Sequence, residues 1–264
     1  MILLIVLIVI IVLYLIACVL FYFLQEFLLF KRKQFRKDFP YHYDFPFEEL
    51  FWDTPDGNTL NGLWIKVPNP KGVILFLHGN SGHMARSGNY FKRVKDLNYD
   101  VVLYDYRGYG KSTGVPAKET FYSDAILIFD WVKKQYPQSK IIVHGLSLGS
   151  HIATYLGAHR KFDLLIMETP FLSIAHIAKF RFPMLPGTFL LKYNLDSSEF
   201  LPHITCPIHV FCGDKDTVVP LSEPLLIPNY NPNVCVTIIK DANHKNVHEF
   251  DEYHQKFEEI LHLK

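Results

Sequence analysis

The chain has 264 residues, enough for one mid-sized domain with a buried core and a short additional segment. Hydrophobic residues make up 49% of it and charged residues 20%, which excludes a chain that stays disordered for lack of apolar residues. The 27 Lys and Arg against 26 Asp and Glu give a net charge of +1, so we expect no nucleic-acid partner.

The first element expected along the chain is an apolar helix. Residues 2–24 contain no charged side chain, and at about 1.5 Å per residue they span roughly 34 Å, enough to cross a hydrocarbon core of about 30 Å. Five cations follow closely: Lys31, Arg32, Lys33, Arg36 and Lys37. We therefore expect residues 1–30 to form a single-pass transmembrane anchor and residues 31–45 a basic juxtamembrane linker.

The charges that flank the anchor also predict its orientation. All five cations follow the apolar stretch, and positively charged flanks tend to stay in the cytoplasm, so we expect the remaining domain on the cytoplasmic side. A removable secretory signal is disfavoured, because no basic residue precedes the apolar run and no small-residue cleavage site follows it. Leu15-Ile16-Ala17-Cys18 resembles a bacterial lipobox, so lipidation at Cys18 is an alternative to a thiol buried in the membrane.

Predicted strands and helices alternate from residue 46 onward. Residues 47–52 and 60–67 flank a turn at Pro55-Asp56-Gly57 and predict an antiparallel hairpin. Short apolar runs that are typical of buried strands follow at residues 73–77, 101–104, 141–143, 164–167, 208–211 and 234–239. The alternation of these runs with helical patterns predicts an α/β domain over residues 46–264, with a mostly parallel central sheet and helices on both faces.

A G-x-S-x-G pattern directly follows the strand predicted at residues 141–143. The chain reads His144-Gly145-Leu146-Ser147-Leu148-Gly149, and a helix is predicted over residues 148–158. In a strand, turn and helix context, the two glycines of this pattern permit a tight bend that lifts the serine oxygen clear of the sheet. Ser147 is therefore the candidate nucleophile, and a helix N-cap is the alternative role for it.

A serine hydroxyl is a weak nucleophile at neutral pH, so this hypothesis requires a base and an acid that orients the base. The strand at residues 208–211 leads into Gly213-Asp214-Lys215-Asp216, and the last strand leads into Ala242-Asn243-His244. The order of serine, aspartate and histidine is that of one known hydrolase architecture. His244 is thus the candidate base, and Asp214 and Asp216 are the candidate acids.

These motifs resemble those of the α/β-hydrolase superfamily, and the resemblance covers roughly four-fifths of the chain. The chain is most similar to membrane-anchored hydrolase-domain serine hydrolases and to the related serine aminopeptidases of the S33 type. The matching stretches are Leu75-Phe76-Leu77-His78-Gly79-Asn80, Tyr104-Asp105-Tyr106-Arg107-Gly108-Tyr109-Gly110-Lys111-Ser112, the turn at Ser147, Gly213-Asp214-Lys215-Asp216 with Val219-Pro220, and Ala242-Asn243-His244.

The resemblance implies further site residues. In this family the acid is the aspartate three residues after the glycine of its loop, which selects Asp216 over Asp214. The family also forms an oxyanion hole from two backbone N–H groups, which correspond here to those of Asn80 and Leu148. Such donors stabilise the negative charge that develops on the carbonyl oxygen during the reaction.

Other polar residues near these motifs are expected to have structural roles. We expect Asp214 to brace the acid loop and His78 to shape the loop that carries the oxyanion donor. Asp105 precedes the serine in the chain, in the wrong order for the acid, so we expect it to brace its own loop with Arg107 as its partner. His248 is expected on the last helix.

No cofactor or metal is expected. Gly110-Lys111-Ser112-Thr113 resembles the end of a phosphate-binding loop, but the position five residues before Gly110 holds Asp105 in place of the required glycine. The Cys and His residues do not have the spacing of a metal site, and acyl transfer to a serine needs no metal.

Residues 171–203 are crowded with large apolar side chains, among them Phe180, Phe182, Met184, Leu185, Phe189, Leu190 and Leu191. Two interpretations are open: a helix that packs on the sheet, or a cap that lines an acyl pocket. In the second case the substrate carries an apolar acyl or alkyl chain and arrives by lateral diffusion in the membrane.

The combined patterns predict a membrane-anchored serine hydrolase that cleaves carboxylic ester or thioester bonds of acyl or lipid-like substrates. In this hypothesis Ser147 attacks, His244 transfers the proton and Asp216 orients His244. An amide or peptide hydrolase of the serine aminopeptidase type is an alternative, since the same three groups cleave both bond types. A non-catalytic membrane-bound binding module is the alternative outside enzymes, although it would not need all three residues.

Overall fold

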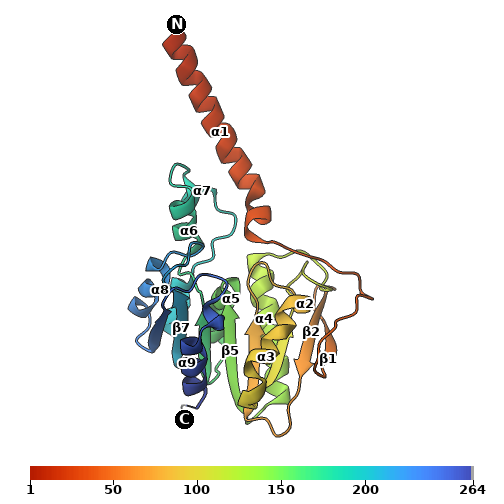
Figure 1. Cartoon of the computed structure of the whole chain (residues 1–264). Coiled ribbons are helices and arrows are strands. Elements are labelled where there is room, and N and C mark those ends of the chain that lie inside the picture. Colours follow the sequence, from red (N-terminus) through yellow and green to blue (C-terminus); the bar gives the residue numbers. More distant parts are fainter. Residues whose placement is uncertain (263–264) are drawn as a thin grey trace.

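The structure, a computed structural model, describes residues 1–262, apart from the side chains of residues 28, 95, 187 and 188. One long helix, α1 (Ile2–Leu29), projects from a domain built around an eight-stranded sheet (Figure 1). The strands are β1 (Glu48–Asp53), β2 (Thr59–Ile65), β3 (Gly72–Leu77), β4 (Asp100–Tyr104), β5 (Lys140–Leu146), β6 (Leu164–Glu168), β7 (Ile208–Gly213) and β8 (Val234–Ile239). The other α-helices are α2 (Met84–Ser87), α3 (Phe91–Val94), α4 (Lys118–Gln135), α5 (Leu148–His159), α6 (Ile174–Arg181), α7 (Gly187–Leu190), α8 (Ser222–Leu226) and α9 (Asp251–His262).

The sheet order is β1-β2-β4-β3-β5-β6-β7-β8. The predicted hairpin is present, because β1 pairs antiparallel with β2, and β2 pairs antiparallel with β4. Strands β3 to β8 are all parallel. Every residue of β3, β4, β6 and β7 is buried, which explains why these strands are continuous apolar runs and do not alternate with polar residues.

Successive residues of the central strands face two separate cores. In β3, Val73, Leu75 and Leu77 belong to the core formed with α4 and α5. Ile74 and Phe76 belong to the core formed with α3 and α9. Because successive side chains of a strand point to opposite faces, helices cover both faces of the sheet. The predicted α/β-hydrolase architecture is thus confirmed.

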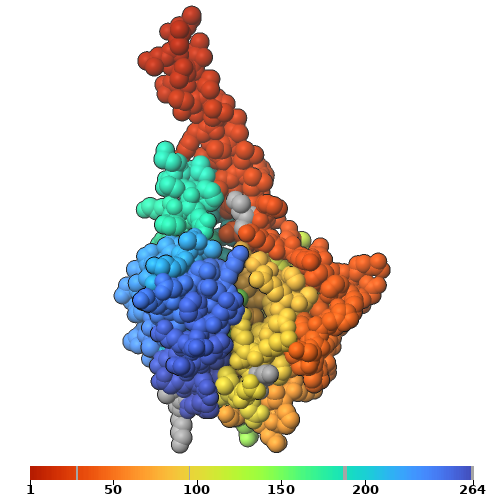
Figure 2. Space-filling view, in the orientation of Figure 1, coloured from red at the N-terminus to blue at the C-terminus, as the bar shows by residue number. Residues whose placement is uncertain are grey.

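The helix α1 has the length and composition of a membrane-spanning helix. The candidate span is Ile2–Phe27, with a mean hydropathy of 3.7. The helix projects away from the domain over most of this length, and its C-terminal part lies beside the α6–α7 segment (Figures 1 and 2).

The residues at the end of α1 pack into the domain. Phe30 is 3% exposed, and its ring centroid lies 4.8 Å from that of Tyr193 and 5.4 Å from that of Phe121. The hydroxyl of Tyr193 donates a hydrogen bond to Glu26 at 2.8 Å. The apolar helix and the core of the domain therefore share a continuous packed junction.

We expect Phe30→Ala to lower the free energy of unfolding by about 3–5 kcal/mol, because it leaves a cavity between α1, α4 and Tyr193. Thermal unfolding of the full chain in detergent micelles, followed by circular dichroism, measures this change. The matched control is Phe27→Ala, since Phe27 is 79% exposed on α1. Equal melting temperatures for the Phe30→Ala variant and the unmutated chain would contradict the packing role of Phe30.

Two buried histidines make the stability of the domain sensitive to acid. His151 of α5 is fully buried, with Nε2 2.7 Å from the hydroxyl of Tyr122 and Nδ1 3.0 Å from that of Ser197. Burial, with a smaller contribution from the charge of Lys118, lowers the pKa of His151 to about 3. Burial also lowers the pKa of His209 to about 4. Both side chains are therefore neutral in the folded chain at pH 7.

In the unfolded chain these histidines titrate at their ordinary pKa of about 6.5 and bind protons that the folded chain does not. We therefore expect the free energy of unfolding to fall as the pH decreases below about 6.5, by up to about 1.4 kcal/mol per pH unit for each histidine. Denaturant unfolding at pH 7, 6 and 5 measures this slope. His151→Gln should reduce it, and an unchanged slope in that variant would refute the contribution of His151.

Candidate active site

Ser147 lies in the turn between β5 and α5 in a strained backbone conformation. Its φ of +52° falls in the left-handed region that residues other than glycine rarely adopt. The glycines of the motif permit the tight bend, as expected, because a side chain at either position would collide with nearby backbone. A Cβ at Gly149 would lie 2.0 Å from the carbonyl oxygen of Leu77, and one at Gly145 would lie 2.4 Å from that of Gly149.

Loops after β5, β7 and β8 bring the three predicted residues together at one edge of the sheet. His244 Nε2 lies 3.2 Å from Ser147 Oγ, and His244 Nδ1 lies 2.7 Å from Asp216 Oδ2. The Asp216 side chain is 3% exposed, and its other oxygen accepts hydrogen bonds from the backbone N–H groups of Val218 and Val219 at 2.7 and 2.8 Å. With Nδ1 donating to the carboxylate, Nε2 is the nitrogen that can accept the proton of Ser147.

The loop after β3 lies directly beside Ser147. A Cβ at Gly79 would lie 3.6 Å from the Cβ of Ser147, so the next residue, Asn80, follows at the rim of the site. The carbonyl oxygen of Asn80 accepts a hydrogen bond from the hydroxyl of Tyr109 at 2.9 Å, and its side-chain amide donates to Leu29 at 3.0 Å. Within the described residues, neither the N–H of Asn80 nor that of Leu148 donates to another loop.

The structural roles of the neighbouring acidic residues are partly as expected. Asp214 braces the loops, because its carboxylate accepts a hydrogen bond from the N–H of Asp241 at 2.7 Å. Asp105 is fully buried and braces its surroundings through the N–H of Met84 at 2.8 Å and through His78 Nε2 at 3.3 Å. His78 in turn has Nδ1 2.8 Å from the carbonyl oxygen of Gly79, which fixes the loop that carries Asn80.

Two expectations about these surroundings are wrong. Arg107 does not pair with Asp105: it forms two hydrogen bonds of 2.8 Å with Asp124 of α4 and also contacts Asp56, because its side chain points away from the site towards α4. His248 lies not on the last helix but in a 3-10 turn, Val247–Glu249, before α9. There it reaches a buried partner that the sequence patterns did not single out.

That partner is Glu168, the last residue of β6, which is 1% exposed. Its carboxylate lies 2.9 Å from His248 Nδ1, 3.0 Å from the hydroxyl of Tyr253, 3.4 Å from His144 Nε2 and 3.5 Å from Arg93. Burial alone would raise the pKa of Glu168, but the two histidines and Arg93 outweigh it and hold that pKa well below its usual range. The sequence feature that could have identified this cluster is Glu168 itself, a charged residue at the carboxyl end of an apolar strand.

The segment between β6 and β7 packs only part of its large apolar side chains into the domain, since Phe171 and Tyr193 are buried in the core. Phe180, Phe182, Met184 and Phe189 are exposed, and α7 lies beside α1 (Figure 1). Arg181, at the end of α6, donates a hydrogen bond to the carbonyl oxygen of Thr217 at 2.8 Å. The segment is thereby joined to the loop of Asp216.

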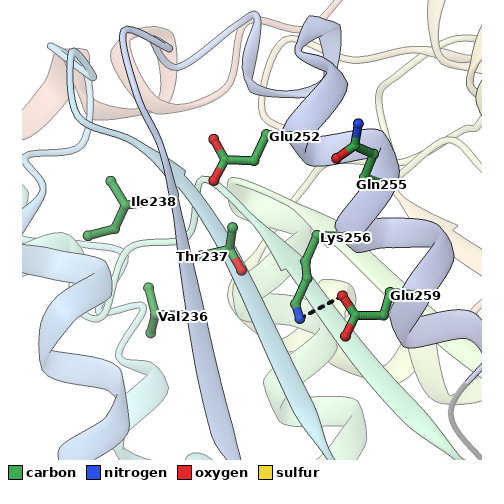
Figure 3. Close-up of a pocket in the computed structure, with 7 residues that line it drawn as sticks. All are labelled: Val236, Thr237, Ile238, Glu252, Gln255, Lys256 and Glu259. Carbon is green, nitrogen blue, oxygen red and sulfur yellow. Dashed lines mark hydrogen bonds and ion pairs between the residues drawn. The ribbon is translucent and has the colours of Figure 1, made fainter.

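Two surface hollows lie away from these residues. A groove of about 450 Å³ between β8 and α9 is lined by Val236, Thr237, Ile238, Glu252, Gln255, Lys256 and Glu259 (Figure 3). Its polar wall contains an ion pair of 2.9 Å between Lys256 and Glu259. A second hollow of about 390 Å³ lies between the juxtamembrane linker and the loop at residues 110–114. Neither is lined by Ser147, Asp216 or His244.

Comparisons with known proteins agree with this fold. Residues 68–196 match the family model described as serine aminopeptidase, S33. The lysophosphatidylserine lipase ABHD12 of Danio rerio is 35% identical over 170 residues, which is 56% of this chain and 44% of that protein. The uncharacterized protein Rv2307c of Mycobacterium tuberculosis is 30% identical over 194 residues, which is 70% of this chain and 68% of that protein.

Solved structures show the same architecture. The Pyrococcus furiosus esterase Pf2001 superposes with a TM-score of 0.71 at 20% identity, covering 88% of this chain and 96% of that one. The chain spans about half the length of the ABHD12 relatives, 44–48% for those of Danio rerio and Mus musculus. From the sequence similarity, the sheet topology and the strand-turn-helix at Ser147 together, we conclude that this chain belongs to the α/β-hydrolase superfamily.

Proposed function

We propose that the protein is a membrane-anchored serine hydrolase that cleaves carboxylic ester or thioester bonds of acyl or lipid-like substrates. The observation that carries this proposal is the chain of contacts from Asp216 through His244 to Ser147, at 2.7 and 3.2 Å. The names of the similar proteins support the choice of ester bonds, since they include a lysophosphatidylserine lipase and an esterase. The apolar helix α1 supports membrane attachment.

The geometry supports a two-step acyl-enzyme mechanism. His244 Nε2 takes the proton of Ser147 Oγ as this oxygen attacks the carbonyl carbon of the substrate. The N–H groups of Asn80 and Leu148 stabilise the oxyanion of the tetrahedral intermediate. His244 then donates the proton to the leaving group, and a water molecule, activated by His244, hydrolyses the acyl-enzyme. Asp216, buried and bound by two backbone N–H groups, keeps Nδ1 protonated throughout.

The proposed organisation follows the distribution of charge along the chain. Residues 1–30 form the anchor, residues 31–45 the basic linker and residues 46–264 the catalytic domain. The five cations between Lys31 and Lys37 favour a catalytic domain on the cytoplasmic side of the membrane. The match to a serine aminopeptidase model makes an amide hydrolase the second candidate, and rates on an acyl ester, an acyl thioester and an aminoacyl anilide distinguish the two.

We expect the purified full-length chain to react covalently with a fluorophosphonate probe and Ser147→Ala to abolish this labelling completely, because the probe captures only an activated serine. In-gel fluorescence measures it. Ser123→Ala is the matched control, since Ser123 is an exposed serine of α4. Undiminished labelling of the Ser147→Ala variant would place the nucleophile elsewhere, and an unlabelled parent chain would favour a non-catalytic module.

The choice between the two aspartates of the acid loop is also testable. We expect Asp216→Asn to lower kcat by about 10⁴-fold with little change in KM, because the amide favours the wrong tautomer of His244. Asp214→Asn should have a much smaller effect, since the carboxylate of Asp214 accepts its hydrogen bond from the backbone N–H of Asp241. Initial rates on p-nitrophenyl esters measure both variants. A larger loss for Asp214→Asn would reverse the assignment.

A further inference from the structure

Four large apolar side chains are exposed at the end of the domain nearest to α1. Phe180, Phe182, Met184 and Phe189 have exposed fractions of 60%, 39%, 82% and 90%, and we call them the apolar tip. Figure 2 shows the α6–α7 segment that carries them as a protrusion beside the lower part of α1. Such clustered exposure of large apolar side chains marks an interaction surface in a soluble domain.

The apolar tip is fixed against the last turns of α1. The ring of Phe182 makes an edge contact with that of Phe21, with centroids 5.2 Å apart. Gln25 is 2% exposed, and its side-chain amide donates to the carbonyl oxygen of Leu190 at 2.6 Å and accepts from the N–H of Lys192 at 2.9 Å. One of these contacts is made within the tip, at Phe182, and the others follow it at Leu190 and Lys192, so they determine its position along α1.

That position places the tip at membrane depth. The candidate span is Ile2–Phe27. Phe21 lies six residues before the C-terminal end of this span, which is about 9 Å along the helix axis. Phe182 packs at the level of Phe21 and is therefore inside the apolar stretch. The ammonium group of Lys192 lies 4.6 Å from the ring centroid of Tyr22, so the cation that follows the tip borders the same level of α1.

The charges around the tip fit a lipid surface as well. No charged residue occurs from Phe182 to Leu191, whereas Lys179, Arg181 and Lys192 flank this stretch on either side. An apolar surface bordered by cations is the pattern of segments that lie about 5–10 Å deep in one leaflet. A protein partner on the same surface would have to lie level with Phe21, inside the bilayer that holds α1.

We propose that the apolar tip inserts into the leaflet that holds the C-terminal end of α1, as a second, non-spanning membrane contact, and that substrate passes from this leaflet directly to Ser147. This inference rests on one part of the proposed function, namely that α1 anchors the chain in the membrane. The site lies next to this contact, because Asn80 is bound to Leu29 at the end of α1 and Arg181 is bound to the Asp216 loop.

The insertion is tested by fluorescence in phosphatidylcholine nanodiscs. The full-length chain carries Met184→Cys in a Cys235→Ser background, since Cys235 is the exposed cysteine among the four, and the new thiol is labelled with an NBD fluorophore. We expect several-fold quenching by phosphatidylcholine with a nitroxide near the headgroup. The matched control is Gln138→Cys, an exposed position in the loop before β5 at the opposite edge of the sheet, which should not be quenched.

Equal and negligible quenching at the two positions would overturn the inference, provided that α1 resists carbonate extraction from the membrane. Release of the chain by carbonate would instead refute the proposed anchor, so the two failures are distinguishable. This measurement does not depend on catalysis.

The route of the substrate is tested by activity. We expect the double variant Met184→Glu and Phe189→Glu to hydrolyse a long-chain acyl ester in phosphatidylcholine vesicles at least 10-fold more slowly, with an unchanged rate on soluble p-nitrophenyl acetate. Leu225→Glu is the control, because Leu225 is 46% exposed on α8, and it should leave both rates unchanged. Equal loss on both substrates, or no loss on vesicles, would overturn the proposed route.

Discussion

The candidate site depends on the left-handed backbone of Ser147. A residue with a side chain in this region costs about 1–3 kcal/mol and persists only where its surroundings impose it. Here the Ser147 N–H donates to the carbonyl oxygen of Glu168 at 2.8 Å, and Gly149 lies so close to Leu77 that no larger residue fits. The neighbouring strands β3 and β6 thus hold the turn on both sides and direct the serine hydroxyl towards His244.

Buried charged groups fix the positions of the other loops of the site relative to this turn. Glu168 connects β6 to His248, four residues after His244, and Asp105 connects the end of β4 to His78 in the loop after β3. Each is a buried carboxylate, which needs a partner to offset the cost of desolvation. The polar network below the site therefore has a structural role that is separate from the contacts of Ser147, His244 and Asp216.

The sequence predicted the parts of the molecule that local patterns encode. Buried parallel strands are continuous apolar runs, the hairpin has its turn residues at Pro55-Asp56-Gly57, and the serine, aspartate and histidine follow the family order. The partners of Arg107, the place of His248 and the cluster around Glu168 were not predictable, because they depend on side chains that meet only through tertiary packing. The sequence could not decide between the two interpretations of residues 171–203 for the same reason, since composition does not tell which surface an apolar side chain faces.

The buried amide of Gln25 has a mechanical consequence. Its two hydrogen bonds, to Leu190 and Lys192, lie in a surrounding of low polarity where breaking them leaves unsatisfied groups. Together with the contacts of Phe30 and Glu26 to Tyr193, they oppose free rotation of the domain about the axis of α1. In the proposed membrane-anchored form, a helix that is longer than the local hydrocarbon thickness tilts to fit it, so bilayer thickness would change the angle between the domain and the lipid surface.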